Sequence, residues 1–123
     1  MQGEILESSR LRKCLWDGPF AMTSQNLTIS GAYALPGGAV NQSPPYMIML
    51  NPGATTQNVT MYSPLPANVM WCHEIWNTSV GAGSLTIKGV GGATIGTVAP
   101  GKRAEVVWNY YLATPEWAAF LSA

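Results

Sequence analysis

The stretch LTIKGVGGATIGTVAPGKRAEVVW, residues 85–108, constrains the fold most, because it alternates short β-type runs with turn signals. β-branched or aromatic side chains dominate three runs, at residues 85–87, 94–98 and 104–108. The glycines of residues 89–92 and the Pro100-Gly101 pair separate these runs, and both are turn-forming sequences. This part of the chain predicts short strands joined by tight turns.

The preceding part of the chain repeats the same pattern. Short apolar runs bounded by Gly, Pro, Asn or Ser occur at residues 27–29, 33–35, 46–50, 58–62 and 69–76. The run YMIML at 46–50 is continuously apolar, which predicts a strand buried on both faces. The pattern predicts an all-β fold, a single small antiparallel β-sandwich or jelly-roll-like domain over residues 24–112.

The two ends of the chain differ from this domain. Residues 1–23 mix charged and apolar side chains without enough length to bury them, which predicts an extended N-terminal arm that docks on another surface. Residues 113–123 begin with Pro115 and Glu116, which favours a short helical or irregular tail with an apolar end. The predicted contact residues for a partner protein or a neighbouring subunit are Leu11, Arg12, Lys13, Leu15, Trp16, Phe20, Trp117, Phe120 and Leu121.

Composition narrows the classes of partner. The 123 residues suit one domain, and six basic residues balance six acidic ones. Charged residues make up 10% of the chain, against about 25% in a typical globular protein. We expect no nucleic-acid partner, because no sustained basic face is present. We expect no membrane segment and no signal peptide, so synthesis in the cytoplasm is expected.

No pattern in the chain predicts catalysis, a cofactor or a metal ion. His73 and Glu74 are adjacent, so on a strand they point to opposite faces and cannot converge on one substrate atom. We interpret them as a polar pair on an edge strand, where His73→Ala and Glu74→Gln change stability by no more than about 1 kcal/mol. Cys14 and Cys72 have no metal-ligand spacing, and a disulfide between them is left open.

Two other motifs have simpler explanations. The glycines of residues 89–92 resemble a phosphate-binding loop, but no Lys-Ser/Thr pair follows, so we expect a hairpin turn. Asn-x-Ser/Thr sequences occur at residues 26–28, 41–43, 58–60 and 77–79. We interpret their polar side chains as turn-forming residues and not as glycosylation sites.

Several motifs in order resemble one known family. They are NVTM at 58–61, PLP at 64–66, EIWNTS at 74–79, LTI at 85–87, GATIGTVAPG at 92–101 and VVW at 106–108. Over residues 24–112 the chain resembles the β domain of head decoration (cement) proteins of tailed bacteriophages, which is similar to some head and tail fibre domains.

The resemblance implies a structural virion protein without enzymatic activity. A homotrimer on the outer capsid surface, bound to the major capsid protein, is the expected assembly. The alternative is a fibre or host-recognition module that binds carbohydrate through its Trp and Tyr side chains.

Overall fold

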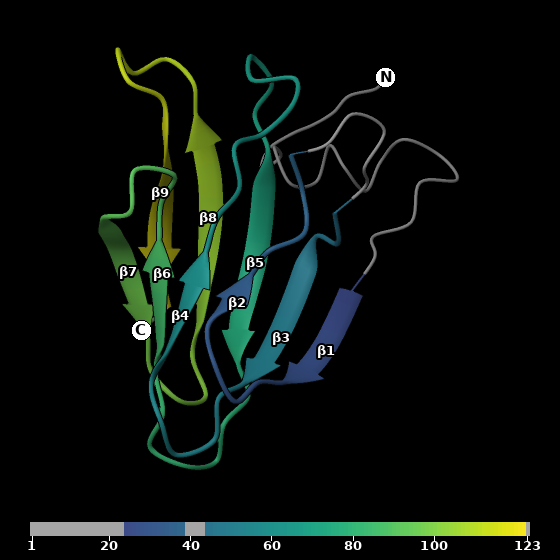
Figure 1. The fold of residues 1–123 in the computed structure, drawn as a ribbon, viewed down its shortest axis with the longest axis vertical. Helices are drawn as coiled ribbons and strands as arrows, with labels where there is room; N and C mark the ends of the chain where they lie inside the picture. Colours follow the sequence, from purple (N-terminus) through teal and green to yellow (C-terminus); the bar gives the residue numbers. More distant parts are fainter. Residues whose placement is uncertain (1–23, 39–43, 123) are drawn as a thin grey trace.

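The computed structural model describes residues 24–38 and 44–122, which form nine strands in two sheets and no helix (Figure 1). The five-stranded sheet, here sheet A, contains in spatial order β1 (Ser24–Thr28), β3 (Met47–Asn51), β5 (Cys72–Asn77), β8 (Arg103–Asn109) and β9 (Glu116–Leu121). The four-stranded sheet, here sheet B, contains in spatial order β2 (Tyr33–Ala34), β4 (Gln57–Thr60), β6 (Leu85–Lys88) and β7 (Thr94–Val98). The prediction of an all-β, two-sheet sandwich is confirmed.

The strand directions are mixed, so the prediction of a purely antiparallel domain is wrong. β1, β3 and β5 pair in parallel in sheet A, and β2, β4 and β6 pair in parallel in sheet B. The chain visits the opposite sheet between successive strands of the same sheet, so each returning strand runs in the same direction as the one before it. Only the β5–β8, β8–β9 and β6–β7 pairs among the described strands are antiparallel.

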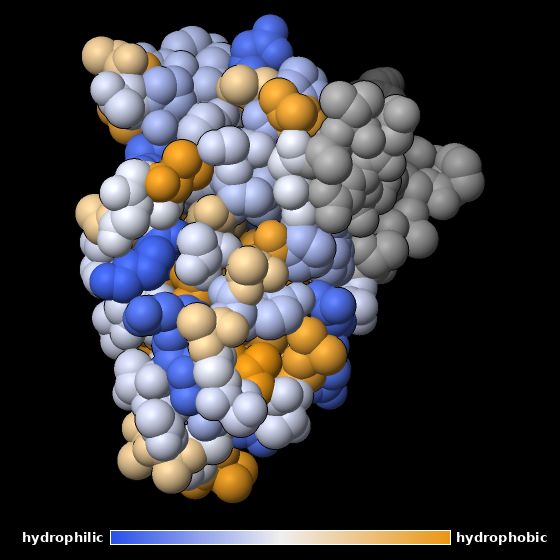
Figure 2. Space-filling view, in the orientation of Figure 1, coloured by the Kyte–Doolittle hydropathy of each residue, from blue (hydrophilic) through white to orange (hydrophobic). Residues whose placement is uncertain are grey.

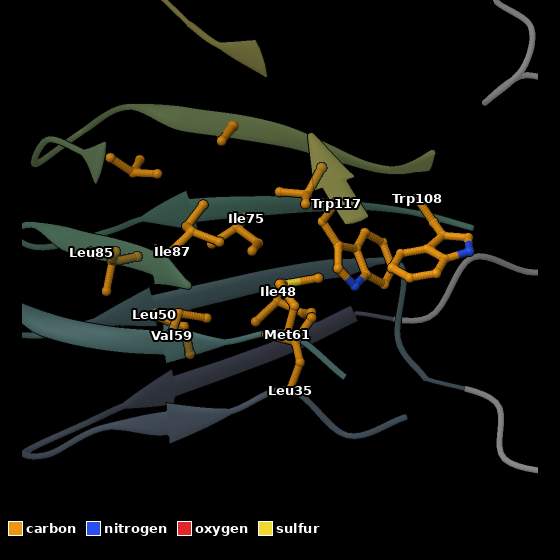
Figure 3. Packing of buried hydrophobic residues seen from close by; sticks show 13 residues of the cluster. Leu35, Ile48, Leu50, Val59, Met61, Ile75, Leu85, Ile87, Trp108 and Trp117 are labelled. Carbon is orange, nitrogen blue, oxygen red and sulfur yellow. The ribbon is translucent and has the colours of Figure 1, made fainter. Parts of the chain in front are cut away.

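The core lies between the two sheets (Figure 3). Fully buried aliphatic side chains from both sheets fill its centre, and they are Ile48, Leu50, Ile75, Val59, Leu85 and Ile87. Trp108 and Trp117 close one end of this cluster. Burial alternates along β3, where Met47 and Met49 are only half-buried, so the prediction that residues 46–50 are buried on both faces is wrong.

Two turns have the glycine geometry that their sequences require. In the β6–β7 loop, the N–H of Gly92 donates to the carbonyl of Gly89 (3.0 Å), and Gly92 has φ of 90°. Before β8, the N–H of Lys102 donates to the carbonyl of Ala99 (3.0 Å), with Gly101 at φ 78°. This second turn leads from β7 in sheet B to β8 in sheet A, so it joins the two sheets.

The C-terminal segment is a strand, so the prediction of a helical or irregular tail is wrong. β9 pairs with β8 from Asn109↔Glu116 to Ala104↔Leu121. Pro115 and Glu116 fit a helix start, but the long β8 offers a complete row of backbone partners, and Trp117 gains a place in the core. The described residues include no helix with the length and apolar character to cross a membrane.

Candidate interaction surface

The outer face of sheet A carries an apolar part, which lies beside polar residues such as Asn26, Glu105 and Asn109. Along β3, β5, β8 and β9 the core residues alternate with side chains that point away from sheet B. These outward residues include Met47, Met49, Trp76, Val107 and Phe120, and Phe120 is 62% exposed. Sheet A thus carries apolar side chains on both of its faces, which is typical of a sheet that packs on a second surface.

The outer face of sheet B is polar. Its outward side chains alternate with core residues on β4, β6 and β7, and they include Asn58, Thr60, Thr86 and Thr97. Figure 2 shows the side on which β4 and β6 pass in front of sheet A, and its apolar residues form separate spots among polar ones. The two outer faces of the sandwich therefore differ in chemistry, and sheet B presents the face suited to water.

A hollow of about 260 Å³ lies where β8 and β9 meet the loop that joins them. It is lined by Met70, Val107, Trp108, Asn109, Tyr110, Tyr111, Ala118 and Phe120. The rings of Tyr110 and Tyr111 stack with centroids 4.4 Å apart, and Tyr111 is 81% exposed. The hollow extends the apolar outer face of sheet A and adds aromatic side chains at its rim.

A charge pair on this face is neutralised locally. The carboxylate of Glu74 accepts hydrogen bonds from Nε1 of Trp76 (2.9 Å) and from the guanidinium of Arg103. Arg103 also lies over the Trp76 ring, 5.3 Å from its centroid. The three side chains therefore interact with one another on this face, and Glu105 of β8 adds a further carboxylate to it. β5 is a central strand of sheet A, so the prediction that His73 and Glu74 occupy an edge strand is wrong.

His73 is buried inside the sandwich, only 2% exposed, so its interpretation as a partly exposed residue is also wrong. Its Nδ1 donates to the carbonyl of Pro45 (2.8 Å), which fixes Nε2 as an acceptor from the hydroxyl of Tyr62 (2.6 Å). Burial lowers the pKa of His73 from 6.5 to about 4, although backbone hydrogen bonds at Pro45 and Tyr46 oppose the change. A neutral imidazole with hydrogen bonds at both of its nitrogen atoms is a structural element of the core.

The structure places the predicted contact residues in different environments. Leu11, Arg12, Lys13, Leu15, Trp16 and Phe20 lie outside the described residues. Phe120 and Leu121 are exposed on β9. Trp117 is only 2% exposed; its Nε1 donates to the carbonyl of Tyr62 (2.8 Å), and its ring packs against Trp108. Trp117 therefore anchors β9 to the core and does not lie on the surface.

Sequence reasoning missed the role of Glu116. Its carboxylate reaches the β6–β7 loop, where the N–H groups of Val90 and Gly91 donate to its two oxygens (2.7 and 2.9 Å). Burial raises the pKa of Glu116, but hydrogen bonds from the backbone of Gly91, Trp117 and Val90 outweigh it, so the net pKa lies below its ordinary value. This contact stabilises the fold above pH 4.5 and is lost as the carboxyl becomes protonated.

Residues 24–38 and 44–122 contain no group of three or more His, Cys, Asp or Glu that could hold a metal ion. Comparisons with protein-family models, with curated proteins and with solved structures give no significant match for this chain. The resemblance to phage head decoration domains therefore rests on the sequence motifs alone.

Proposed function

We propose that this protein is a structural component of a phage virion, a decoration protein that binds the outer capsid surface and stabilises contacts between major capsid subunits. The observation that supports the proposal is the difference between the two outer faces of the sandwich. The apolar part of the outer face of sheet A, with Val107 and Phe120, suits burial against capsid protein, and the Thr-rich face of sheet B suits exposure to water.

The proposed mechanism is mechanical. Each buried Phe or Val side chain contributes about 1.5–3 kcal/mol when it leaves water, so even a small contact is significant. The contact is repeated over the many subunits of a capsid, and copies that bind as a closed homotrimer hold several subunits together. Residues 1–23 form a second proposed anchor, because Trp16 and Phe20 add apolar side chains to a segment that carries both basic and acidic residues.

A charge placed on each outer face tests which one binds. We expect Phe120→Glu to weaken binding to capsid shells that lack this protein at least tenfold, because it buries a carboxylate in an apolar contact. Thr97→Glu on sheet B is the matched control, since it also adds a charge to an exposed strand residue, and its affinity should stay within about twofold. The measurement is a sedimentation binding assay with shells assembled from the major capsid protein.

The outcomes of this assay test the choice of binding face separately from the capsid role. Equal affinities for wild type and Phe120→Glu would contradict the assignment of sheet A as the binding face. An absence of wild-type binding to the shells would contradict the capsid role itself. Analytical ultracentrifugation of the free protein tests the trimer, since a particle of three 13.1 kDa chains is expected and a pure monomer would contradict it.

The stacked tyrosines favour a second candidate, a fibre module that recognises carbohydrate on the host. Tyr110 and Tyr111 present aromatic surface beside the hollow, and sugar rings bind such surfaces through their apolar faces. In that case a glycan array shows a reproducible ligand, Tyr111→Ala removes the signal, and the wild-type protein does not bind capsid shells. An array without a ligand would leave the decoration role as the better explanation.

A further inference from the structure

The β6–β7 loop has the geometry of a carboxylate receptor. Two successive backbone N–H groups, of Val90 and Gly91, point at the two oxygens of one carboxylate at 2.7 and 2.9 Å. Such successive N–H groups form a small concave site with positive potential, which favours an anion without any basic side chain. The loop therefore suits an anion with two acceptor oxygens, such as a carboxylate.

The space for this carboxylate depends on Gly89. A Cβ atom at Gly89 would lie 2.6 Å from the carboxyl carbon of Glu116, closer than two such atoms approach in proteins. Gly89 does not have a positive φ, so its backbone does not itself require glycine. The missing side chain at this position is needed for the bound carboxylate and not for the turn.

The site is open to solvent. Val90 is 42% exposed and Gly91 is exposed, and both hydrogen bonds to Glu116 lie at the surface. Glu116 is the first residue of β9, which Trp117 anchors to the core, and its Oε1 also accepts from the N–H of Trp117 (3.0 Å). The Glu116 side chain is not itself part of the core, so its rotation would empty the loop while the core stays packed. Glu116 is thus a resident ligand that can be exchanged.

We propose that the β6–β7 loop is a carboxylate-binding site which Glu116 occupies in the free protein, and that an acidic side chain of an adjoining protein subunit can take its place. The inference stands on the geometry of the loop and does not depend on the proposed function. A partner that presents a carboxylate here competes with a tethered group, so further contacts along the same edge of the molecule must support it.

The test empties the site and offers it a free carboxylate. In the full-length Glu116→Ala variant at pH 7, sodium acetate should shift the amide proton resonances of Val90 and Gly91 in a saturable way. Half-saturation on the order of 100 mM is expected, because two charge-assisted hydrogen bonds at an exposed site give weak affinity. Sodium chloride at equal ionic strength should leave these resonances unchanged, and wild type should not respond to acetate.

Gly89→Ala provides the matched control. Combined with Glu116→Ala, its methyl group fills the position of the carboxylate, so acetate should no longer shift the two amides. A folded Glu116→Ala protein whose Val90 and Gly91 amides ignore acetate would overturn the proposal. So would an equal acetate response in the Gly89→Ala, Glu116→Ala double variant.

A second measurement on wild type covers the case in which Glu116→Ala does not fold. Acid titration should move the Val90 and Gly91 amide protons upfield with a midpoint below pH 4.5, as the carboxylate of Glu116 is protonated. Amides that stay fixed through this titration would contradict the site in the same way.

Discussion

Asn77→Ala is expected to destabilise the protein by about 3–4 kcal/mol, a large effect for a polar side chain. Asn77 is only 1% exposed at the end of β5, where the chain leaves sheet A for sheet B. Its Nδ2 donates to the carbonyls of Gly83 and Val98, both at 2.9 Å, and its Oδ1 accepts from the N–H of Ser79 (3.0 Å). One side chain thus satisfies three backbone groups from two segments, the β5–β6 connection and the end of β7.

The expected magnitude follows from what the substitution leaves behind. Gly83, Val98 and Ser79 are buried, so water cannot replace the lost partner without opening the loop. Each unsatisfied buried group costs about 1 kcal/mol or more, and the three costs add because one side chain supplies every partner. Urea unfolding followed by Trp fluorescence measures the loss.

Two further substitutions sharpen this test. Asn77→Asp keeps the acceptor for Ser79 but turns the donor toward Gly83 and Val98 into an acceptor, so at pH 7 it should cost at least as much as Asn77→Ala. Asn58→Ala removes an exposed amide from β4 and should change stability by no more than about 0.5 kcal/mol. An Asn77→Ala cost below about 1 kcal/mol would refute the proposed role of Asn77 in joining the segments.

The Asn-x-Ser/Thr sequences adopt different local structures in this protein. At residues 77–79 the interpretation as turn chemistry is confirmed, because the Asn77 side chain accepts from the backbone two residues ahead. At residues 26–28 and 58–60 it is wrong, since these residues lie in β1 and β4. Residues 41–43 lie outside the described residues. The same short motif serves both structures, and only the pairing partners decide between them.

Strand positions could be predicted from sequence because apolar runs and turn residues are local signals. The strands β3, β4, β5, β6, β7 and β8 overlap the predicted runs closely. The order and direction of the strands could not be predicted, because alternation between two sheets is a property of the whole chain. β9 was missed for a similar reason: Pro115 and Glu116 resemble a helix start, and the pairing with β8 that overrides them is a tertiary contact.

The candidate sites divide in the same way. Sequence shows that Phe120 and Leu121 are apolar, but their exposure and the burial of Trp117 depend on the register between β8 and β9. The contact between Glu116 and the β6–β7 loop joins residues that are 25 or 26 positions apart in the sequence and belong to different sheets. No local sequence pattern predicts it. The sequence predicts a partly exposed His73 in a polar pair on an edge strand, whereas β5 is a central strand and two hydrogen bonds satisfy the buried imidazole.

Lowering the pH from 7 to 5 is expected to cost the fold about 2 kcal/mol through His73 alone. Its pKa is about 4 in the folded protein and near the ordinary 6.5 in the unfolded chain. Between these values the unfolded state binds a proton that the folded state does not, so stability rises with pH through this window. The stabilisation is complete above pH 6.5 and falls as the pH drops toward 4, by about 3 kcal/mol in total.

The single histidine of the chain makes this measurement clean. Carboxyl groups titrate mostly below pH 5, so the slope of unfolding free energy between pH 7 and pH 5 reports His73 almost alone. His73→Gln should be less stable than wild type at pH 7 by about 2–3 kcal/mol, because it loses ring packing against Tyr62 and Trp117 and cannot keep both hydrogen bonds. Its stability should nevertheless be nearly flat between pH 7 and pH 5.

Tyr62→Phe separates burial of the imidazole from its hydrogen bonding. The aromatic ring is retained, but Nε2 of His73 loses the hydroxyl that donates to it, so about 1 kcal/mol of stability should be lost at pH 7. The lost hydrogen bond favoured the neutral imidazole, so the pKa of His73 in the folded protein should rise above 4. The fall in stability with decreasing pH should then end at a higher pH than in wild type. A Tyr62→Phe protein with the wild-type pH profile would show that desolvation alone sets this pKa. A wild-type protein with constant stability from pH 7 to pH 5 would contradict the burial of a neutral His73.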